Sequence, residues 1–102
     1  MCLQRLLPRL ARGGSVVLVS SVAVRKGSYD PAYAASKGAV DSLVRALAVE
    51  LRGVCRVNAV APGLVAGSPI HRSMPEAHEA RHLERTLNGE LVTSEDVAEL
   101  VM

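Results

Sequence analysis

The chain has 102 residues, enough for one domain or part of one, and 49% of them are hydrophobic. The hydrophobic residues are almost all aliphatic or Ala, which indicates a folded core and excludes a disordered chain. The formal net charge is only +2, and two Tyr with no Phe or Trp offer little for base stacking, so a nucleic-acid partner is not expected.

Cysteine use and hydropathy further restrict the classes of protein to which the chain can belong. Cys2 and Cys55 are the only cysteines and show no CxxC spacing, which predicts reduced thiols rather than a disulfide framework or a zinc site. No apolar run approaches the roughly 20 residues of a membrane span, and residues 1–12 lack the features of a signal peptide. The sequence therefore predicts a cytoplasmic protein without a membrane partner.

The N-terminal segment combines helix, turn and strand signals. Leucines at helical spacing in residues 1–12 predict the tail of a helix, disturbed by Pro8 and stopped by Gly13 and Gly14. The β-branched run at residues 15–21 predicts a buried strand, and residues 22–30 are expected to form a loop.

A long helix and a second strand follow. Asp30 is a good N-cap and Pro31 suits the first helical position, so a helix is expected from there to about Arg52, ended by Gly53. Its apolar stripe comprises Val40, Leu43, Val44, Leu47 and Leu51. Residues 54–61 predict a second strand, closed by Pro62-Gly63. Strand, helix and strand form a βαβ unit, so the two strands should be parallel.

The C-terminal third is less regular. A polar helix is expected around residues 76–87, and residues 93–96 predict a helix cap that leads into a last helix. Two parallel strands do not form a sheet that is stable alone. The sequence therefore predicts an α/β fold in which residues 1–102 make up a single partial domain.

Candidate catalytic residues lie where the first strand ends and the long helix begins. Tyr33 and Lys37 are four residues apart, so their side chains share one helix face. A free phenol has a pKa of about 10, and a neighbouring ammonium favours the phenolate that a general acid–base needs. A hydroxyl of Ser20 or Ser21 can reach the same place. This spacing alone is also typical of helices without catalytic roles, and the serines also suit a turn.

Three runs carry a resemblance to a known family: GGSVVLVSSVA, YAASKGAVDSLVRALAVEL and RVNAVAPGLV, which together extend from Gly13 to Val65. In this order and spacing they resemble the short-chain dehydrogenase/reductase family. The resemblance implies a Rossmann-like doubly wound parallel sheet that binds NAD or NADP. It also implies hydride transfer between nicotinamide and a small carbonyl or secondary-alcohol substrate.

The resemblance assigns roles to individual residues. Tyr33 would be the acid–base, and Lys37 would stabilise its phenolate and hydrogen-bond the nicotinamide ribose. Ser21, or Ser20, would hold the substrate oxygen: the strand pattern selects Ser21, whereas the family's usual gap to the Tyr selects Ser20. The loop at residues 22–32 is then one residue short if Ser21 is correct, and we favour Ser21 because loop length drifts easily.

Cofactor contacts and oligomerisation are implied in the same way. Pro62, Gly63 and Val65 match the family's turn beside the nicotinamide, and Ser68 stands near the family's usual Thr. Tyr33 and Lys37 would also touch the cofactor. Small residues on the long helix would allow the close packing by which members form dimers or tetramers: Ala34, Ala35, Gly38 and Ala39.

The chain departs from the family in one major respect. Its eight glycines include no GxGxxG or TGxxxGxG arrangement, and no strand lies upstream of residue 15 to carry one. The N-terminal nucleotide-binding half is thus expected to be missing, and these residues alone should bind NAD(P) poorly. The alternative to a fragment of an oxidoreductase is a non-catalytic remnant that acts as a dimerisation or interaction module.

Three histidines raise the question of a metal site. His78 and His82 are four residues apart on an expected helix, and His71 precedes them. No Cys or clear third ligand converges with them, so we expect a solvated helix face and no metal. In the resembled family this segment is a variable lid over the substrate.

Overall fold

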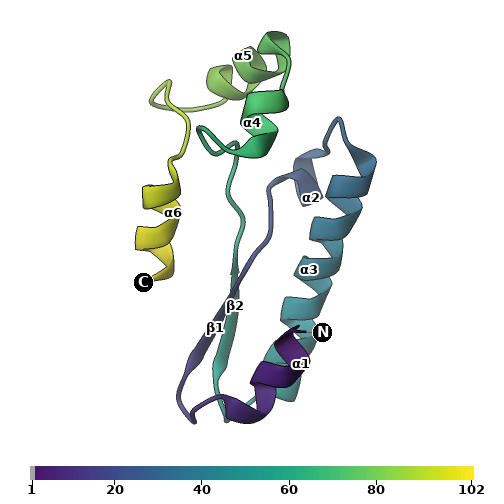
Figure 1. Ribbon diagram of the computed structural model, residues 1–102, viewed down its shortest axis with the longest axis vertical. Helices are drawn as coiled ribbons and strands as arrows, with labels where there is room; N and C mark the ends of the chain where they lie inside the picture. Colours follow the sequence, from purple (N-terminus) through teal and green to yellow (C-terminus); the bar gives the residue numbers. More distant parts are fainter. Residues whose placement is uncertain (1) are drawn as a thin grey trace.

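The computed structural model describes residues 2–102, with side chains from Gln4 onward (Figure 1). In chain order its elements are α1 (Cys2–Leu6), a 3-10 turn (Leu7–Arg9), β1 (Ser15–Val19), α2 (Ala23–Lys26), α3 (Pro31–Glu50), β2 (Arg56–Val60), α4 (Pro69–Ser73), α5 (Glu76–Glu84) and α6 (Ser94–Val101). The helix expected at the N-terminus, the βαβ unit and the capped last helix are all present.

The sheet consists of β1 and β2, which are parallel as predicted and pair from Ser15 with Arg56 to Val19 with Val60. Backbone pairing continues beyond the strands, because the Ser20 N–H donates to the Val60 carbonyl at 2.8 Å and the Val22 N–H to the Pro62 carbonyl at 3.2 Å. The segment with the two serines therefore lies directly beside the turn that follows β2.

Helix α3 begins as the sequence predicts. The Asp30 carboxylate accepts hydrogen bonds from the N–H groups of Ala32 and Tyr33, and Pro31 occupies the first turn. All five residues of the predicted apolar stripe are buried or half-buried, and Leu47 is 4% exposed. The helix ends at Glu50, two residues before the predicted end. Gly53, with φ +81°, then makes the left-handed turn into β2.

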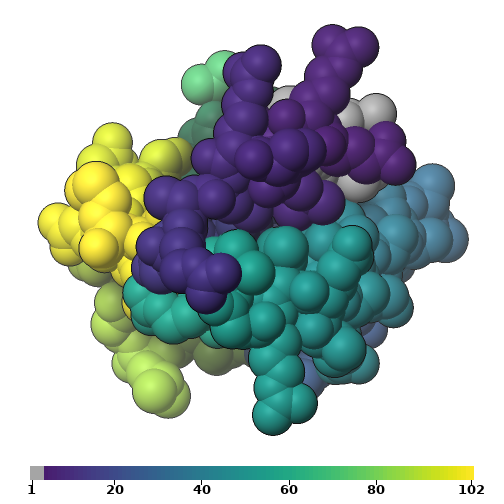
Figure 2. Space-filling model, turned by 90° about the horizontal axis from the view of Figure 1, so that it is seen from below, coloured from purple at the N-terminus to yellow at the C-terminus, as the bar shows by residue number. Residues whose placement is uncertain are grey.

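The helices are arranged around the two strands so that a functional site can form at one end of the sheet. Helix α3 packs along both strands on one side and α6 contacts β2 on the other (Figure 1). Helices α2, α4 and α5 gather at the carboxyl ends of the strands. At the opposite end, the N-terminal segment lies beside the end of α3 and the start of β2 (purple and teal in Figure 2).

Several boundaries differ from those predicted. The expected loop at residues 22–30 contains α2, and the Ser21 hydroxyl accepts a hydrogen bond from the N–H of Ala23, the first residue of that helix. Strand β1 ends at Val19 instead of residue 21, and β2 covers residues 56–60 instead of 54–61. The expected helix at residues 76–87 ends at Glu84, and α4 precedes it.

Much apolar surface stays exposed. The chain exposes 7450 Å², whereas a compact protein of this mass exposes about 5,500 Å². Its radius of gyration is 15.6 Å, against about 13 Å for a compact domain of this length. Among the side chains described, only Leu47 and Leu64 are buried hydrophobic residues. Within residues 2–102, no helix combines the length and apolar character needed to cross a membrane.

Candidate active site

A cavity of about 700 Å³ opens at the carboxyl ends of β1 and β2, within the range of about 300–1,000 Å³ typical of small-molecule sites. Its walls come from the end of β1, α2, the start of α3, the turn after β2 and α5. Every site residue that the sequence indicated lines it: Ser20, Ser21, Tyr33, Lys37, Pro62, Gly63, Val65 and Ser68. Residues up to 48 positions apart along the chain thus meet in one place.

Lys37 is fixed beside Tyr33. The Lys37 ammonium donates a hydrogen bond to the carbonyl oxygen of Val19, the last residue of β1, at 3.0 Å. The same nitrogen lies 5.9 Å from the centroid of the Tyr33 ring, inside the distance of about 6 Å at which a cation interacts with an aromatic face. Both side chains are half-buried. The end of the strand therefore holds a positive charge next to the phenol.

The two serines make different hydrogen bonds. Ser20 is 3% exposed, and its hydroxyl donates to the Lys37 carbonyl oxygen at 3.5 Å. The Ser21 hydroxyl oxygen accepts from the Ala23 N–H at 3.1 Å, and its proton has no acceptor among the described residues. A free hydroxyl proton is what a substrate oxygen requires. The geometry therefore favours Ser21 over Ser20 as the donor to a ligand.

The turn after β2 is held by contacts that the sequence did not reveal. Val65 forms a parallel bridge with Val92, and the Ala66 N–H donates to the Val92 carbonyl at 2.8 Å. The Ser68 hydroxyl caps α4 by accepting from the His71 N–H at 3.2 Å. Ser68, expected beside a cofactor, thus lines the cavity and also begins a helix.

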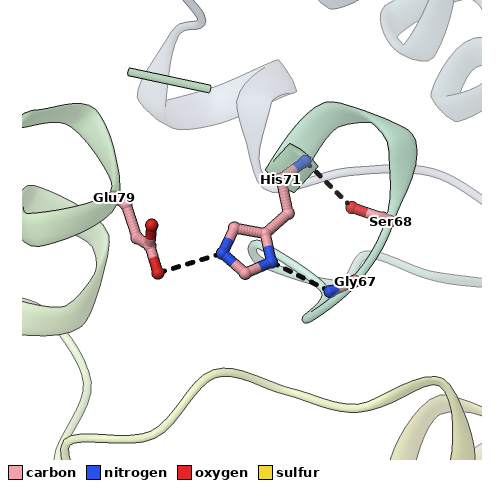
Figure 3. A network of polar contacts seen from close by, with 4 residues as sticks. All are labelled: Gly67, Ser68, His71 and Glu79. Atoms are coloured by element: carbon pink, nitrogen blue, oxygen red, sulfur yellow. Dashed lines mark hydrogen bonds and ion pairs between the residues drawn. The ribbon is translucent and has the colours of Figure 1, made fainter. Parts of the chain in front are cut away.

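His71 joins three segments of this region (Figure 3). Its Nδ1 accepts a hydrogen bond from the Gly67 N–H at 2.9 Å, and its Nε2 lies 3.0 Å from the Glu79 carboxylate. Because Nδ1 is an acceptor, the proton resides on Nε2 and is donated to Glu79. The imidazole therefore connects the turn, α4 and α5. The sequence pattern did not predict this role of His71, because the role depends on a contact between two separate helices.

The expectation of a solvated face for His78 and His82 is wrong. Both are half-buried and line the cavity, because α5 packs over the loop before α3. The His78 ring lies 5.2 Å from the Tyr29 ring, tilted by 51°. The pKa of His82 lies below its ordinary value, first because of burial and then because of positive charge on Arg85, His78 and Lys26. No group of three or more His, Cys, Asp or Glu that could hold a metal is found in the described part of the chain.

Comparison with known proteins identifies the family. The family model described as enoyl-(acyl carrier protein) reductase matches residues 1–102. The chain belongs to the short-chain dehydrogenase/reductase family. A solved family member from Brucella melitensis, described as a glucose/ribitol dehydrogenase, superimposes with a TM-score of 0.85 at 32% identity and covers 97% of this chain. This likeness confirms the predicted α/β Rossmann-like fold class.

Relatives in the short-chain dehydrogenase/reductase family are much longer than this chain. The inactive 2-(S)-hydroxypropyl-CoM dehydrogenase 2 of Xanthobacter autotrophicus is 43% identical over 96 residues, 86% of this chain and 41% of that protein. The 3-oxoacyl-[acyl-carrier-protein] reductase FabG of Thermotoga maritima is 39% identical over 93 residues, 89% of this chain and 37% of its own length. The chain therefore spans about two fifths of these relatives. The angucycline ketoreductase LanV, solved with bound NADP, matches with a TM-score of 0.82 at 31% identity, over 97% of this chain and 39% of LanV.

Proposed function

We propose that this chain supplies the catalytic half of an NAD(P)-dependent oxidoreductase that interconverts a carbonyl compound and a secondary alcohol. The observation that carries the proposal is the hydrogen bond from Lys37 to the end of β1, which holds an ammonium beside Tyr33 in a cavity that Ser21 also lines. Membership of the short-chain dehydrogenase/reductase family supports it.

Ser21, Tyr33 and Lys37 would each have a distinct chemical role. The free Ser21 hydroxyl donates a hydrogen bond to the carbonyl oxygen of the substrate. Tyr33 transfers its phenolic proton to that oxygen as negative charge develops there, and the charge of Lys37 stabilises the phenolate that remains. Tyr33 and Lys37 would hold the nicotinamide end of the cofactor, whose chemistry would be to supply the hydride. In the direction of oxidation, the Tyr33 phenolate takes the proton back.

The donor set fits the nicotinamide end of the cofactor. Tyr33 and Lys37 offer polar groups for a ribose. Pro62 and Gly63 line the same cavity, and so do Val65 and Ser68. No glycine-rich phosphate loop occurs among the 102 residues. We therefore infer that residues 1–102 are one partial domain and that residues outside it hold the pyrophosphate. The large exposed surface supports this inference.

Two further features belong to the proposal. Ala35 and Ala39 are exposed on α3, and a side chain added at Gly38 would meet open space, so this face can accept the helix of a second copy in a homodimer or homotetramer. Cys55 is a free thiol, in keeping with a reducing cytoplasm.

The second candidate is a non-catalytic remnant that serves as an interaction module. It is favoured by the exposed apolar side chains, among them Leu100 and Val101 on α6 at 74% and 41%, and by a relative whose name describes it as inactive. Co-purification with a full-length reductase, without any nucleotide binding, would support this alternative.

Nucleotide titration tests the first candidate. The fluorescence of NADH and NADPH would be followed as they bind to the chain, with circular dichroism as the check on folding. We expect weak, saturable binding that Lys37→Met lowers about tenfold or more, because the charged donor proposed for the nicotinamide ribose is lost.

Arg45→Met is the matched control, since Arg45 pairs with Asp41 at 3.0 Å on an exposed part of α3 and does not line the cavity. Equal effects of both substitutions would contradict the proposed role of Lys37 in cofactor binding. No binding by a folded chain would mean that the catalytic pair is present here but that cofactor binding belongs to a longer protein.

A further inference from the structure

The cavity has a basic wall that the proposed chemistry does not use. Lys26, at the end of α2, and Arg81 and Arg85, on α5, all line it. Arg81 and Arg85 are four residues apart, so they occupy the same helix face, although Arg85 lies one position beyond the end of the helix proper. We call Lys26, Arg81 and Arg85 the basic wall.

No described carboxylate forms an ion pair with the basic wall. Among the described side chains, Asp41 pairs with Arg45, and Glu79 accepts the hydrogen bond of the neutral His71 at 3.0 Å. Glu79 keeps its negative charge but makes no ion pair with Arg81, which lies two residues further along α5. Asp30 is the one described carboxylate that lines the cavity, and it accepts hydrogen bonds from the first N–H groups of α3.

The loop after α2 and helix α5 meet at the cavity. The ring of Tyr29, in that loop, contacts the His78 ring of α5 at 5.2 Å. The pKa of His82, also on α5, is lowered first by burial and then by the charges of Arg85, His78 and Lys26. Positive charge from both elements therefore lines the same cavity.

Resting on the oxidoreductase function proposed above, we propose that Lys26, Arg81 and Arg85 bind an anionic group of the substrate: a carboxylate, a sulfonate or a phosphate. Guanidinium groups bind such oxyanions through paired hydrogen bonds. Apolar side chains complete the lining and suit the body of the molecule: Val22, Leu64, Ile70, Met74 and Leu91. The substrate therefore combines a carbonyl or hydroxyl group at Tyr33, an apolar middle and a negative end.

Matched substrates test the proposal in the natural protein that carries these residues. Straight-chain oxo acids whose ketone lies next to the terminal methyl group, with increasing numbers of CH2 groups between ketone and carboxylate, would be compared with their methyl esters, which lack the charge. We expect the protein to prefer an acid over its ester, and Arg81→Gln/Arg85→Gln to lower kcat/KM for the acid about tenfold or more while the ester stays within about twofold. Arg72→Gln is the matched control, since Arg72 is exposed on α4 and does not line the cavity.

Binding of inorganic phosphate and methanesulfonate, followed by residue-resolved NMR, gives a readout independent of turnover. We expect saturable shifts at Lys26, Arg81 and Arg85 that the double variant abolishes and Arg72→Gln retains. An unchanged preference for the acid in a folded double variant would overturn the proposal. So would weaker binding of NADH or NADPH with the acid preference intact, because the wall would then serve the cofactor. If neither acid nor ester is reduced by any form, the oxidoreductase function itself fails, and the anion-binding substrate site with it.

Discussion

Asp30 determines where α3 begins and therefore where Tyr33 lies. Its Oδ1 accepts hydrogen bonds from the N–H groups of Ala32 at 3.0 Å and of Tyr33 at 3.2 Å. Loss of such a cap typically costs about 1 kcal/mol, within a range of about 0.5–2 kcal/mol. A carboxylate at a helix N-terminus adds about 0.3–1 kcal/mol at low salt. We therefore expect Asp30→Ala to lower the free energy of unfolding by about 1–2 kcal/mol.

Urea unfolding followed by circular dichroism measures this loss, provided that the slope of the transition is unchanged. Asp30→Asn keeps an acceptor and loses only the charge, so it should lose about 0.3–1 kcal/mol, and less at high salt. Ser36→Ala is the matched control on the same helix, because the exposed Ser36 hydroxyl donates only to the Tyr33 carbonyl one turn back. Equal stabilities for Asp30→Ala and Ser36→Ala would refute the capping argument.

Two further predictions concern pH. The Thr93 N–H and then the Thr93 hydroxyl lower the pKa of Asp96, so the stabilisation that they provide is complete above the ordinary Asp pKa and is lost as pH falls through the lowered value. In Asp96→Asn, the free energy of unfolding measured in urea should therefore depend less on pH between about pH 5 and pH 2. The pKa of His82 is also lowered, mainly by burial. The folded state therefore binds fewer protons than the unfolded state, and the free energy of unfolding falls as pH drops below about 6.5. His82→Gln should therefore reduce the loss of stability between about pH 7.5 and pH 5, and an unchanged slope would contradict the placement of His82.

The sequence predicted the features that depend on neighbours along the chain. Asp30 and Pro31 mark the start of α3 because capping acts over three residues. Tyr33 and Lys37 come together because helical geometry brings residues four apart onto one face. The parallel pairing of the strands follows from the length of the connection between them.

Features that depend on distant segments were not predictable in this way. The bridge between Val65 and Val92 joins strand-like residues 27 positions apart. The contact of His71 with Glu79 requires α4 and α5 to be placed first. For the same reason, His82 was expected in solvent but lies against the cavity. Helical periodicity shows which residues share a face, but not what that face packs against.

The central claim is that Tyr33 is the acid–base of an oxidoreductase. Its most direct test is the turnover of Tyr33→Phe in the natural protein that carries these residues, measured as oxidation of NADH or NADPH with a carbonyl substrate. We expect a loss of about 10²–10⁴-fold, because positioned proton transfer contributes that much, while cofactor affinity stays nearly unchanged. Tyr29→Phe is the matched control: Tyr29 is 53% exposed, and Phe keeps its ring against His78. Turnover by Tyr33→Phe equal to that of the unsubstituted protein would contradict the claim.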